Sequence, residues 1–319
     1  NKIFPIFLMW ETGPLDTLKN RVEDLLRGQP RPTAGIWDAT RSWYNERLER
    51  LFVKPGSLMW GEMKQNADAI SLARFRAVDL HVTTKPDLTP VSDADTAVER
   101  ALRAALADAR PDDAVLGEEF GVAEPAHGTA GRRWVIDPID GTKNFIRGVP
   151  IWATLIALLE HGQPVVGLVS APALGRRWWA ASGHGAFAGP DRADATALRV
   201  SGVTQLSDAS FCYSSLNGWE RIGRLEAILD LNRRTWRQRA FGDFYGYMLL
   251  AEGAVDIMVE PELSVWDLAA LIPIVTEAGG ILTGLNGRPG PDGASAIAAN
   301  RALHQQVISR LGVETDMTT

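Results

Sequence analysis

Residues 134–145 read Trp134-Val135-Ile136-Asp137-Pro138-Ile139-Asp140-Gly141-Thr142-Lys143-Asn144-Phe145, and the rest of the chain can be interpreted outward from this segment. Its first three residues are apolar and largely β-branched, which predicts a buried strand that ends where Asp137 meets Pro138. Asp137 and Asp140 then place two carboxylates on a predicted sharp turn. In a core, their repulsion and desolvation would cost several kcal/mol without a compensating cation, so we expect a divalent metal there. A solvated acidic turn, Asp-Pro followed by Asp-Gly, is the alternative interpretation.

Gly141 and Thr142 follow this acidic pair and begin the next predicted segment. Backbone N–H groups at the start of a helix point toward bound anions, and the macrodipole of the helix favours negative charge at that end. Together with the Thr142 hydroxyl, these groups predict a phosphate-binding site directly beside the expected metal.

The composition limits the classes of function that remain. With 319 residues, 45% of them hydrophobic and 23% charged, the chain has enough apolar side chains for one large layered domain or for two domains. A net charge of −6 argues against general nucleic-acid binding, although a local metal cluster can hold a phosphate on an acidic protein. Cys212 is the single cysteine, so no disulfide can form within the chain, which favours a reducing cytoplasm. The histidines are scattered, which argues against a zinc site.

Residues 1–57 carry no motif that we can assign to chemistry. The apolar run at 3–10 is too short to cross a membrane and lacks the cleavage site of a signal peptide. Amphipathic helical patterns follow at 15–26 and 36–52. We expect an appended element that packs on the main domain without catalytic residues, and a fusion or a processed fragment is the alternative.

Residues 58–195 are predicted to form an α+β subdomain. Its predicted helices cover 60–78 and 96–109, and Ser92 or Asp93 is expected to cap the second of them. His161-Gly162-Gln163 predicts a hairpin turn between two strands. The predicted strands of this subdomain lie at 80–82, 115–120, 134–137, 152–159, 165–169, 177–182 and 185–187.

Residues 196–319 are predicted to form a second subdomain, in which strands and helices alternate. This alternation is typical of an α/β unit with a largely parallel or mixed sheet. Gly279-Gly280 should end one helix, and Asn286-Gly287 should form a hairpin turn. The predicted strands lie at 209–214, 236–241, 255–259 and 295–299, and the predicted helices at 220–231, 244–252, 266–278 and 303–311.

Three motifs in a fixed order then point to a family. Gly117-Glu118-Glu119 precedes Asp137-Pro-Ile-Asp140-Gly-Thr142, and Trp266-Asp267-Leu-Ala-Ala follows it. Over about residues 58–312, this set resembles the inositol-monophosphatase-like family of metal-dependent phosphatases, and within it a bacterial, actinobacterial-type histidinol-phosphate phosphatase branch. The resemblance implies a layered αβαβα sandwich of the type shared with fructose-1,6-bisphosphatase, of mixed α+β and α/β character.

The same resemblance implies the metal ligands. Glu118, Asp137 and the carbonyl of Ile139 would hold one ion, and Asp137, Asp140 and Asp267 a second, so that Asp137 bridges them. A third, weaker ion would lie near Glu118. A ligand set made only of oxygen atoms suits Mg²⁺, with Mn²⁺ as a substitute. For Asp267 the alternative interpretation is a helix cap.

The catalytic and phosphate-binding residues are also implied by the resemblance. Thr142, in contact with Asp93, would orient the attacking water and take up its proton, and Glu118 would assist at the metal. The N–H groups of Gly141 and Thr142 would hold the phosphate.

The substrate pocket follows from the resemblance as well. Glu260 matches the position that contacts the alcohol portion of the substrate, Asp243 and Arg239 would line the same pocket, and Lys85 and Asp87 would lie at its mouth. Two acids suit a cationic amino alcohol, so histidinol phosphate is the expected substrate.

Other interpretations remain at this stage. Inositol phosphates, a sugar bisphosphate or an adenosine bisphosphate are alternative substrates. A metal-binding regulatory protein without turnover, with residues 1–57 as its interaction module, is an alternative of a different class. We expect a cytoplasmic homodimer that acts on a small phosphorylated substrate and has no nucleic-acid or membrane partner.

Overall fold

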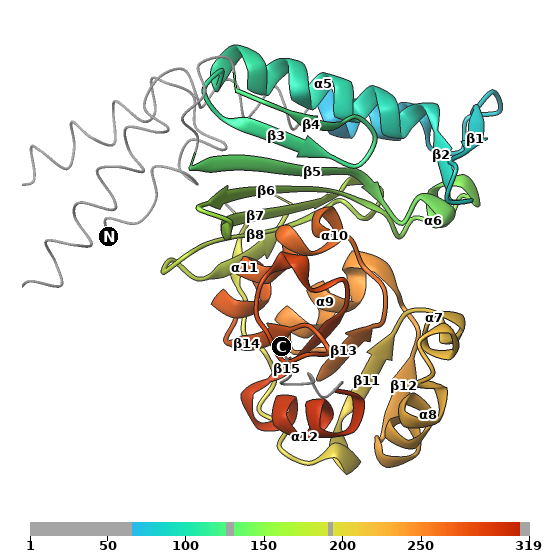
Figure 1. Cartoon of the computed structure of the whole chain (residues 1–319), viewed down its shortest axis with the longest axis vertical. Helices are drawn as coiled ribbons and strands as arrows, with labels where there is room; N and C mark the ends of the chain where they lie inside the picture. The colour runs from blue at the N-terminus through green and yellow to red at the C-terminus, as the bar shows by residue number, and fades with distance from the viewer. Residues whose placement is uncertain (1–65, 126–130, 191–193, 313–319) are drawn as a thin grey trace, which may run out of the picture.

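Two β-sheets lie in separate layers, with helices between them and on both outer faces (Figure 1). The computed structural model describes residues 66–125, 131–190 and 194–312. The order of helix, sheet, helix, sheet and helix layers confirms the predicted αβαβα sandwich. The predictions for residues 1–57 lie outside the described residues, and the helix expected at 60–78 is described only from residue 66, with helical residues at 66–74.

The larger sheet is mostly antiparallel. Its strand order is β10-β9-β8-β7-β6-β5-β3-β4, and only the neighbours β3 and β5 run parallel. His161 and Gly162 both have positive φ and connect β6 to β7, which confirms the predicted hairpin. The strands are β3 (Ala114–Gly117), β4 (Gly121–Ala123), β5 (Arg132–Asp140), β6 (Ala153–Glu160), β7 (Gln163–Ala171), β8 (Arg176–Ala181), β9 (Ala186–Gly189) and β10 (Thr196–Ala197).

Helix α5 (Asp93–Ala109) covers the outer face of this sheet. Ser92 is its N-cap, and a capping box with Asp95 satisfies the free N–H groups of the first turn. Val98, Leu102 and Leu106 recur at helical spacing and pack against Trp134 and Ile136 of β5, among others, in a shared apolar cluster. The helix is therefore fixed by its apolar side, and its first turn lies close to the end of β5.

The smaller sheet is mixed, as the alternation of elements predicted. Its order is β12-β11-β13-β15-β14, with β11 parallel to β12 and β13 and the remaining pairs antiparallel. Cys212 is a buried, free cysteine in β11. The strands are β11 (Ser210–Tyr213), β12 (Arg237–Arg239), β13 (Ile257–Glu260), β14 (Gly280–Thr283) and β15 (Ala296–Asn300).

Helices α9 (Asp243–Ala251), α10 (Val265–Ala269) and α11 (Leu271–Glu277) lie between the sheets (Figure 1). The largest apolar cluster joins these helices to the inner faces of both sheets. Gly167 of β7 permits this contact, since a Cβ there would lie 2.1 Å from the carbonyl oxygen of Ala270. The single helix predicted at 266–278 is thus two short helices that meet at Ala270.

The second outer helical layer consists of α7 (Leu216–Arg221), α8 (Leu225–Arg234) and α12 (Arg301–Leu311). The helix predicted at 220–231 is divided, because Gly223 with φ +68° interrupts it. At one end of the larger sheet lie the hairpin of β1 (Val82–Thr84) and β2 (Pro90–Ser92) and the short helix α6 (Thr142–Ile146). None of the helices in the described ranges is both long enough and apolar enough to span a membrane.

Candidate active site

An irregularity in β5 brings two of the acids to one face of the sheet. Asp137 lies opposite Leu155 of β6 and Asp140 lies opposite Ala153, so three steps along β5 match two along β6. Leu155 and Ala153 both face the core between the sheets, and the paired acids therefore face the same side. The predicted end of the strand at Asp137 is wrong, because β5 continues to Asp140 and accommodates Pro138 inside the bulge, where the missing N–H is tolerated.

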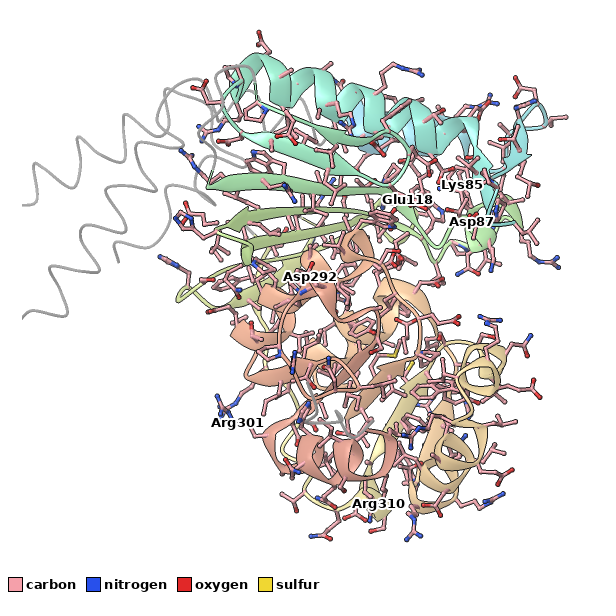
Figure 2. The ribbon with its side chains drawn as sticks, viewed as in Figure 1. Lys85, Asp87, Glu118, Asp292, Arg301 and Arg310 are labelled. Atoms are coloured by element: carbon pink, nitrogen blue, oxygen red, sulfur yellow. The ribbon has the colours of Figure 1, made fainter. Side chains whose placement is uncertain are left out.

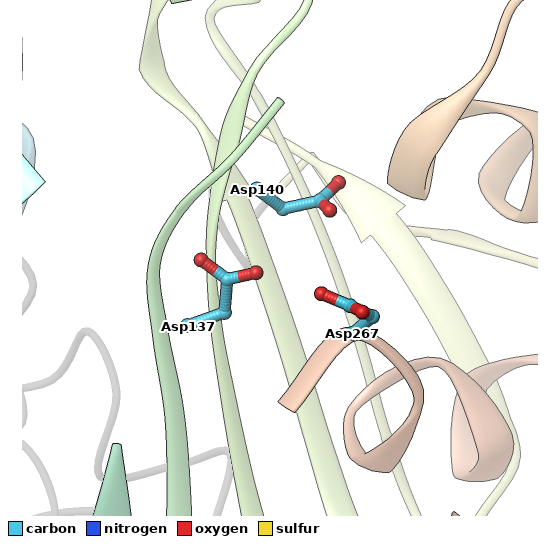
Figure 3. A group of neighbouring side chains, drawn as sticks. All are labelled: Asp137, Asp140 and Asp267. Atoms are coloured by element: carbon cyan, nitrogen blue, oxygen red, sulfur yellow. The ribbon is translucent and has the colours of Figure 1, made fainter. Parts of the chain in front are cut away.

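The third acid comes from the layer of helices between the sheets. Asp267 is the third residue of α10, where Ser264 is the N-cap and the two residues form a capping box. The backbone N–H of Ser264 donates to Asp267 Oδ2 at 2.6 Å. The N-cap of the alternative interpretation is therefore Ser264 and not Asp267, which completes the capping box, and the Asp267 carboxylate also points toward the acids of β5 (Figure 3).

Asp137, Asp140 and Asp267 form a compact acidic group. One carboxylate oxygen from each lies within 4.8 Å of those of the other two (Figure 3). Burial, followed by the charges of Glu118, Asp140 and Asp267, raises the pKa of Asp137 well above its ordinary value. Burial and the charge of Asp243 do the same to the pKa of Asp140, and burial raises the pKa of Asp267 to about 6. All three acids would be stabilised as anions by a cation placed among them.

One oxygen atom of this group has no partner at all. Asp137 is 1% exposed, and its Oδ1 is buried without a hydrogen bond in the described structure. Such an atom costs free energy unless it is satisfied by an unseen ligand. Three converging carboxylates with an unsatisfied buried oxygen fit a hard divalent cation, which prefers oxygen ligands. The arrangement therefore fits a metal site.

Asp140 also connects β5 to the helix layer. Its Oδ2 accepts a hydrogen bond of 2.6 Å from the backbone N–H of Phe244, in the first turn of α9. The neighbouring Asp243 adopts φ +46° at the start of this helix, and its Oδ2 accepts a hydrogen bond of 3.1 Å from Asn144. The start of α9 is thereby fixed against both β5 and α6.

Glu118 follows β3 and lies beside the three aspartates without belonging to the compact group. Lys85 was expected at the mouth of the site, and its Nζ lies 2.8 Å from Glu118 Oε1 and 2.6 Å from Glu119 Oε1. Burial opposes the charge of Lys85, yet these two hydrogen bonds outweigh it and raise the Lys85 pKa. Figure 2 shows Lys85, Asp87 and Glu118 at the same end of the larger sheet. Asp87 itself accepts hydrogen bonds from Thr89 within its own turn.

The expected contact between Thr142 and Asp93 is wrong. The Thr142 hydroxyl lies 3.1 Å from Asp95 Oδ1 and 3.0 Å from the carbonyl oxygen of Ile139. Asp93 turns away and forms an ion pair with Arg74, with 2.7 Å between Arg74 Nη2 and Asp93 Oδ2. Burial raises the pKa of Asp95, although hydrogen bonds from Ser92 and Thr142 oppose the shift. Asp95, and not Asp93, is the acid that contacts Thr142.

Gly141 and Thr142 lie where the sequence predicted, at the start of a helix directly after β5. Gly141 is the N-cap of α6 and adopts φ +85°. A Cβ at this position would lie 3.0 Å from the carbonyl oxygen of Ile151 and 3.1 Å from Asp243 Oδ2. Both the positive φ and the close approach explain why glycine occupies this position.

The predicted alcohol pocket is brought together only in part. Glu260 ends β13, is 4% exposed, and accepts a hydrogen bond of 2.8 Å from the hydroxyl of Tyr247. Burial, and after it the charge of Asp243, raises the pKa of Glu260 well above its ordinary value. The two acids therefore lie near each other. Arg239 is exposed at the end of β12, and its Nη1 donates to the carbonyl oxygen of Gln238 at 2.7 Å. No hydrogen bond or ion pair in the described part of the chain joins Arg239 to Glu260 or Asp243.

The match to a known family covers the whole acidic site. Residues 62–314 match the model of the inositol monophosphatase family. The chain belongs to the inositol monophosphatase family. Members of this family are generally metal-dependent, which agrees with an acidic group that could hold a metal.

Relatives within the family include two histidinol-phosphatases. That of Streptomyces coelicolor is 62% identical over 249 residues, which covers 77% of this chain and 92% of that protein. That of Mycobacterium tuberculosis is 57% identical over 249 residues, covering 78% of this chain and 95% of that protein. An inositol monophosphatase structure from Zymomonas mobilis is 32% identical and has a TM-score of 0.68, covering 83% of this chain and 98% of that one.

Several residues around the acidic group were assigned no role from the sequence. Asp95 could have been found from the capping rules, because Ser92 followed three residues later by an acid indicates a capping box. Glu99, Asn144 and Tyr247 carry no local signal, since each acts through a hydrogen bond to a residue that is distant in sequence, such as the bond between Tyr247 and Glu260.

Proposed function

We propose that this chain is a phosphoric monoester hydrolase that converts histidinol phosphate to histidinol and phosphate, a step of histidine biosynthesis. The observation that carries the catalytic part is the acidic group of Asp137, Asp140 and Asp267, with a buried oxygen that has no partner. The substrate is supported by the identities of 62% and 57% to two histidinol-phosphatases. The presence of every predicted carboxylate argues against a regulatory protein without turnover.

The proposed cofactor is Mg²⁺, with two ions and a third, weaker one near Glu118. Glu118, Asp137 and the carbonyl oxygen of Ile139 would hold one ion, and Asp137, Asp140 and Asp267 the other. The chemistry that Mg²⁺ supplies when bound is activation of a water and neutralisation of charge on the leaving oxygen. Mn²⁺ has the same preference for oxygen ligands and would substitute.

Thr142 and Asp95 would act on the attacking water. The Thr142 hydroxyl is within hydrogen-bonding distance of Asp95 Oδ1, at 3.1 Å, so its oxygen can accept a hydrogen bond from water while its own proton points to Asp95. Asp95 is completely buried, and burial raises its pKa, which suits a group that takes up a proton in the reaction. The N–H groups of Gly141 and Thr142 would hold the phosphate.

Glu260 and Asp243 would bind the cationic end of histidinol. Glu260 is buried and Asp243 is partly buried. No lysine or arginine in the described residues forms an ion pair with either acid, although the charge of Lys143 acts on Asp243, so Glu260 in particular has no cationic partner. An ammonium or imidazolium group of the substrate would supply that missing charge. Inositol 1-phosphate, the second candidate, is favoured by the similarity to the Zymomonas mobilis structure, but a neutral polyol would gain less from two acids.

The deciding experiment compares phosphate release from histidinol phosphate and inositol 1-phosphate with Mg²⁺. We expect kcat/KM for histidinol phosphate to be at least about tenfold higher in the native chain. Glu260→Gln should reduce this preference. Glu262→Gln is the matched control, because its exposed carboxylate forms an ion pair with Arg221 at the surface. A preference for inositol 1-phosphate would support the second candidate instead.

The homodimer, the cytoplasmic location and a role for Arg239 and Lys85 in substrate binding stay predictions.

A further inference from the structure

Tyr247 and Glu260 form a buried hydrogen-bonded pair beside the proposed alcohol pocket. Tyr247 lies in α9 and is 0% exposed, and Glu260 ends β13 and is 4% exposed. The Tyr247 hydroxyl donates to Glu260 Oε2 at 2.8 Å. A hydrogen bond from the Ser214 side chain reaches the same carboxylate. Two hydroxyl groups therefore fix the orientation of one buried acid.

The surroundings of this pair are acidic. In the described ranges no lysine or arginine forms an ion pair with Glu260, and the charges that act on it are those of Asp243 and Asp267. Burial and the negative charge of Glu260 raise the pKa of Tyr247 well above its ordinary value, so the phenol keeps its proton and remains a donor. Hydrogen bonds to a carboxylate favour its charged form, and here they come from neutral groups only.

Tyr245 provides an internal comparison on the same helix. Its ring packs edge-on against Trp178 and Phe241, it is half-buried, and no acid among the described residues accepts a hydrogen bond from it. Removal of the hydroxyl from Tyr245 or Tyr247 is the same chemical change two residues apart. Only at Tyr247 does this change remove a hydrogen bond to Glu260.

We propose that Tyr247 is a positioning residue that sets the preference of the enzyme for a cationic amino-alcohol phosphate by holding the Glu260 carboxylate toward the substrate. This inference rests on the proposed function of Glu260. Tyr247 does not contact the reacting phosphate and acts through Glu260. Its loss should weaken binding of the cationic end without altering the chemical step.

The test compares Tyr247→Phe with Tyr245→Phe in the full chain with saturating Mg²⁺. For Tyr247→Phe we expect KM for histidinol phosphate to rise about tenfold, kcat to stay within about twofold, and KM for inositol 1-phosphate to stay unchanged. Tyr245→Phe should leave all of these values at the native level. Calorimetric binding of histidinol, which carries the cation without the phosphate, should weaken by the same factor as KM. An equal effect on both substrates, or an effect on kcat alone, would overturn the proposal.

A double-mutant cycle with Glu260→Gln separates positioning from general destabilisation. If Tyr247 acts through Glu260, then Tyr247→Phe should not change KM for histidinol phosphate further in the Glu260→Gln background. Ser214→Ala provides a second variant that removes the other hydroxyl without disturbing α9, and we expect a smaller rise in KM. Additive effects in the cycle would contradict the inference. If the native chain released no phosphate from histidinol phosphate, the proposed function itself would be wrong, which is a distinct result.

Discussion

Glu99 accepts a hydrogen bond from the backbone N–H of Glu119, with 2.7 Å between the nitrogen and Glu99 Oε2. The other oxygen, Oε1, accepts from the N–H of Phe120 at 3.2 Å and from Arg103 at 2.7 Å. Glu99 is 0% exposed in α5, and a Cβ on Gly117 would collide with its carboxylate. One buried side chain of the outer helix thus holds the turn that carries Glu118, whose charge acts on Asp137 of the acidic group.

Glu99→Gln should lower the free energy of unfolding by about 1–3 kcal/mol, because the amide can accept at only one of two positions that both face N–H donors. Chemical denaturation measures this loss. Glu124→Gln is the matched control, since Glu124 is exposed at the end of the same hairpin and should lose almost nothing. Equal losses in the two variants would show that Glu99 does not hold the turn.

Asp137→Asn should abolish phosphate release while the chain remains folded. Burial and neighbouring acids raise the pKa of the Asp137 carboxyl group, which means that its charged form is unfavourable in the folded chain. Because the substitution removes this buried charge, the variant without metal should be at least as stable as the native chain without metal. Thermal unfolding with a chelator and with Mg²⁺ measures this, and we expect Mg²⁺ to stabilise the native chain but not the variant. Asp292→Asn, at an exposed position, is the control. Native activity in Asp137→Asn would rule out the metal mechanism.

His304 should make stability depend on pH. Its Nε2 lies 3.0 Å from the Thr283 hydroxyl, and burial lowers its pKa below the ordinary value of 6.5. The unfolded chain therefore takes up a proton before the folded one as pH falls. Above pH 6.5 the imidazole is neutral in both the folded and the unfolded chain, and the burial of His304 does not reduce stability. Below pH 6.5 the free energy of unfolding falls, by up to about 1.4 kcal/mol per pH unit.

His304→Gln should consequently remove this loss, so that the unfolding free energy of the variant minus that of the native chain should rise as pH falls from about 7.5 to 5. His81→Gln, at an exposed histidine, should leave the curve parallel to that of the native protein. The comparison uses the difference between variants because buried acids such as Asp95, whose pKa is raised, change stability in the opposite direction. Parallel curves for His304→Gln would contradict this assignment.

Deletion of residues 1–57 should leave phosphatase activity measurable, since every residue with a proposed role in the reaction lies between Lys85 and Asp267. Phosphate release and circular dichroism on the shortened chain provide the check. A shortened chain that folds and binds Mg²⁺ without any activity would show that the removed segment contributes to the site.

The layered fold and the set of three aspartates followed from the family resemblance that the order of the motifs indicates. Individual strands, helices and turns followed from local patterns, because strand alternation, helical spacing and turn residues are encoded over short distances. The hairpin at His161-Gly162 is one such case. The partner of Thr142 was missed because Asp93 and Asp95 lie two residues apart in the first turn of one helix, and the role implied by the resemblance was assigned to the wrong one of these two acids. Tyr247 and Glu260 meet only after α9 packs on the smaller sheet, so no local signal predicts their contact.

The bulge in β5 also limits how relatives of this chain can diverge. Pro138 and Ile139 supply the extra step that returns Asp140 to the side of Asp137, so the number of residues between the two acids matters as much as the acids themselves. Loss of the bulge at the same chain length would restore strict alternation over these three steps and turn one of the two carboxylates toward α5. Over evolutionary time the three-residue spacing of the acids and the bulge can therefore change only together if both carboxylates are to stay on one face of the sheet.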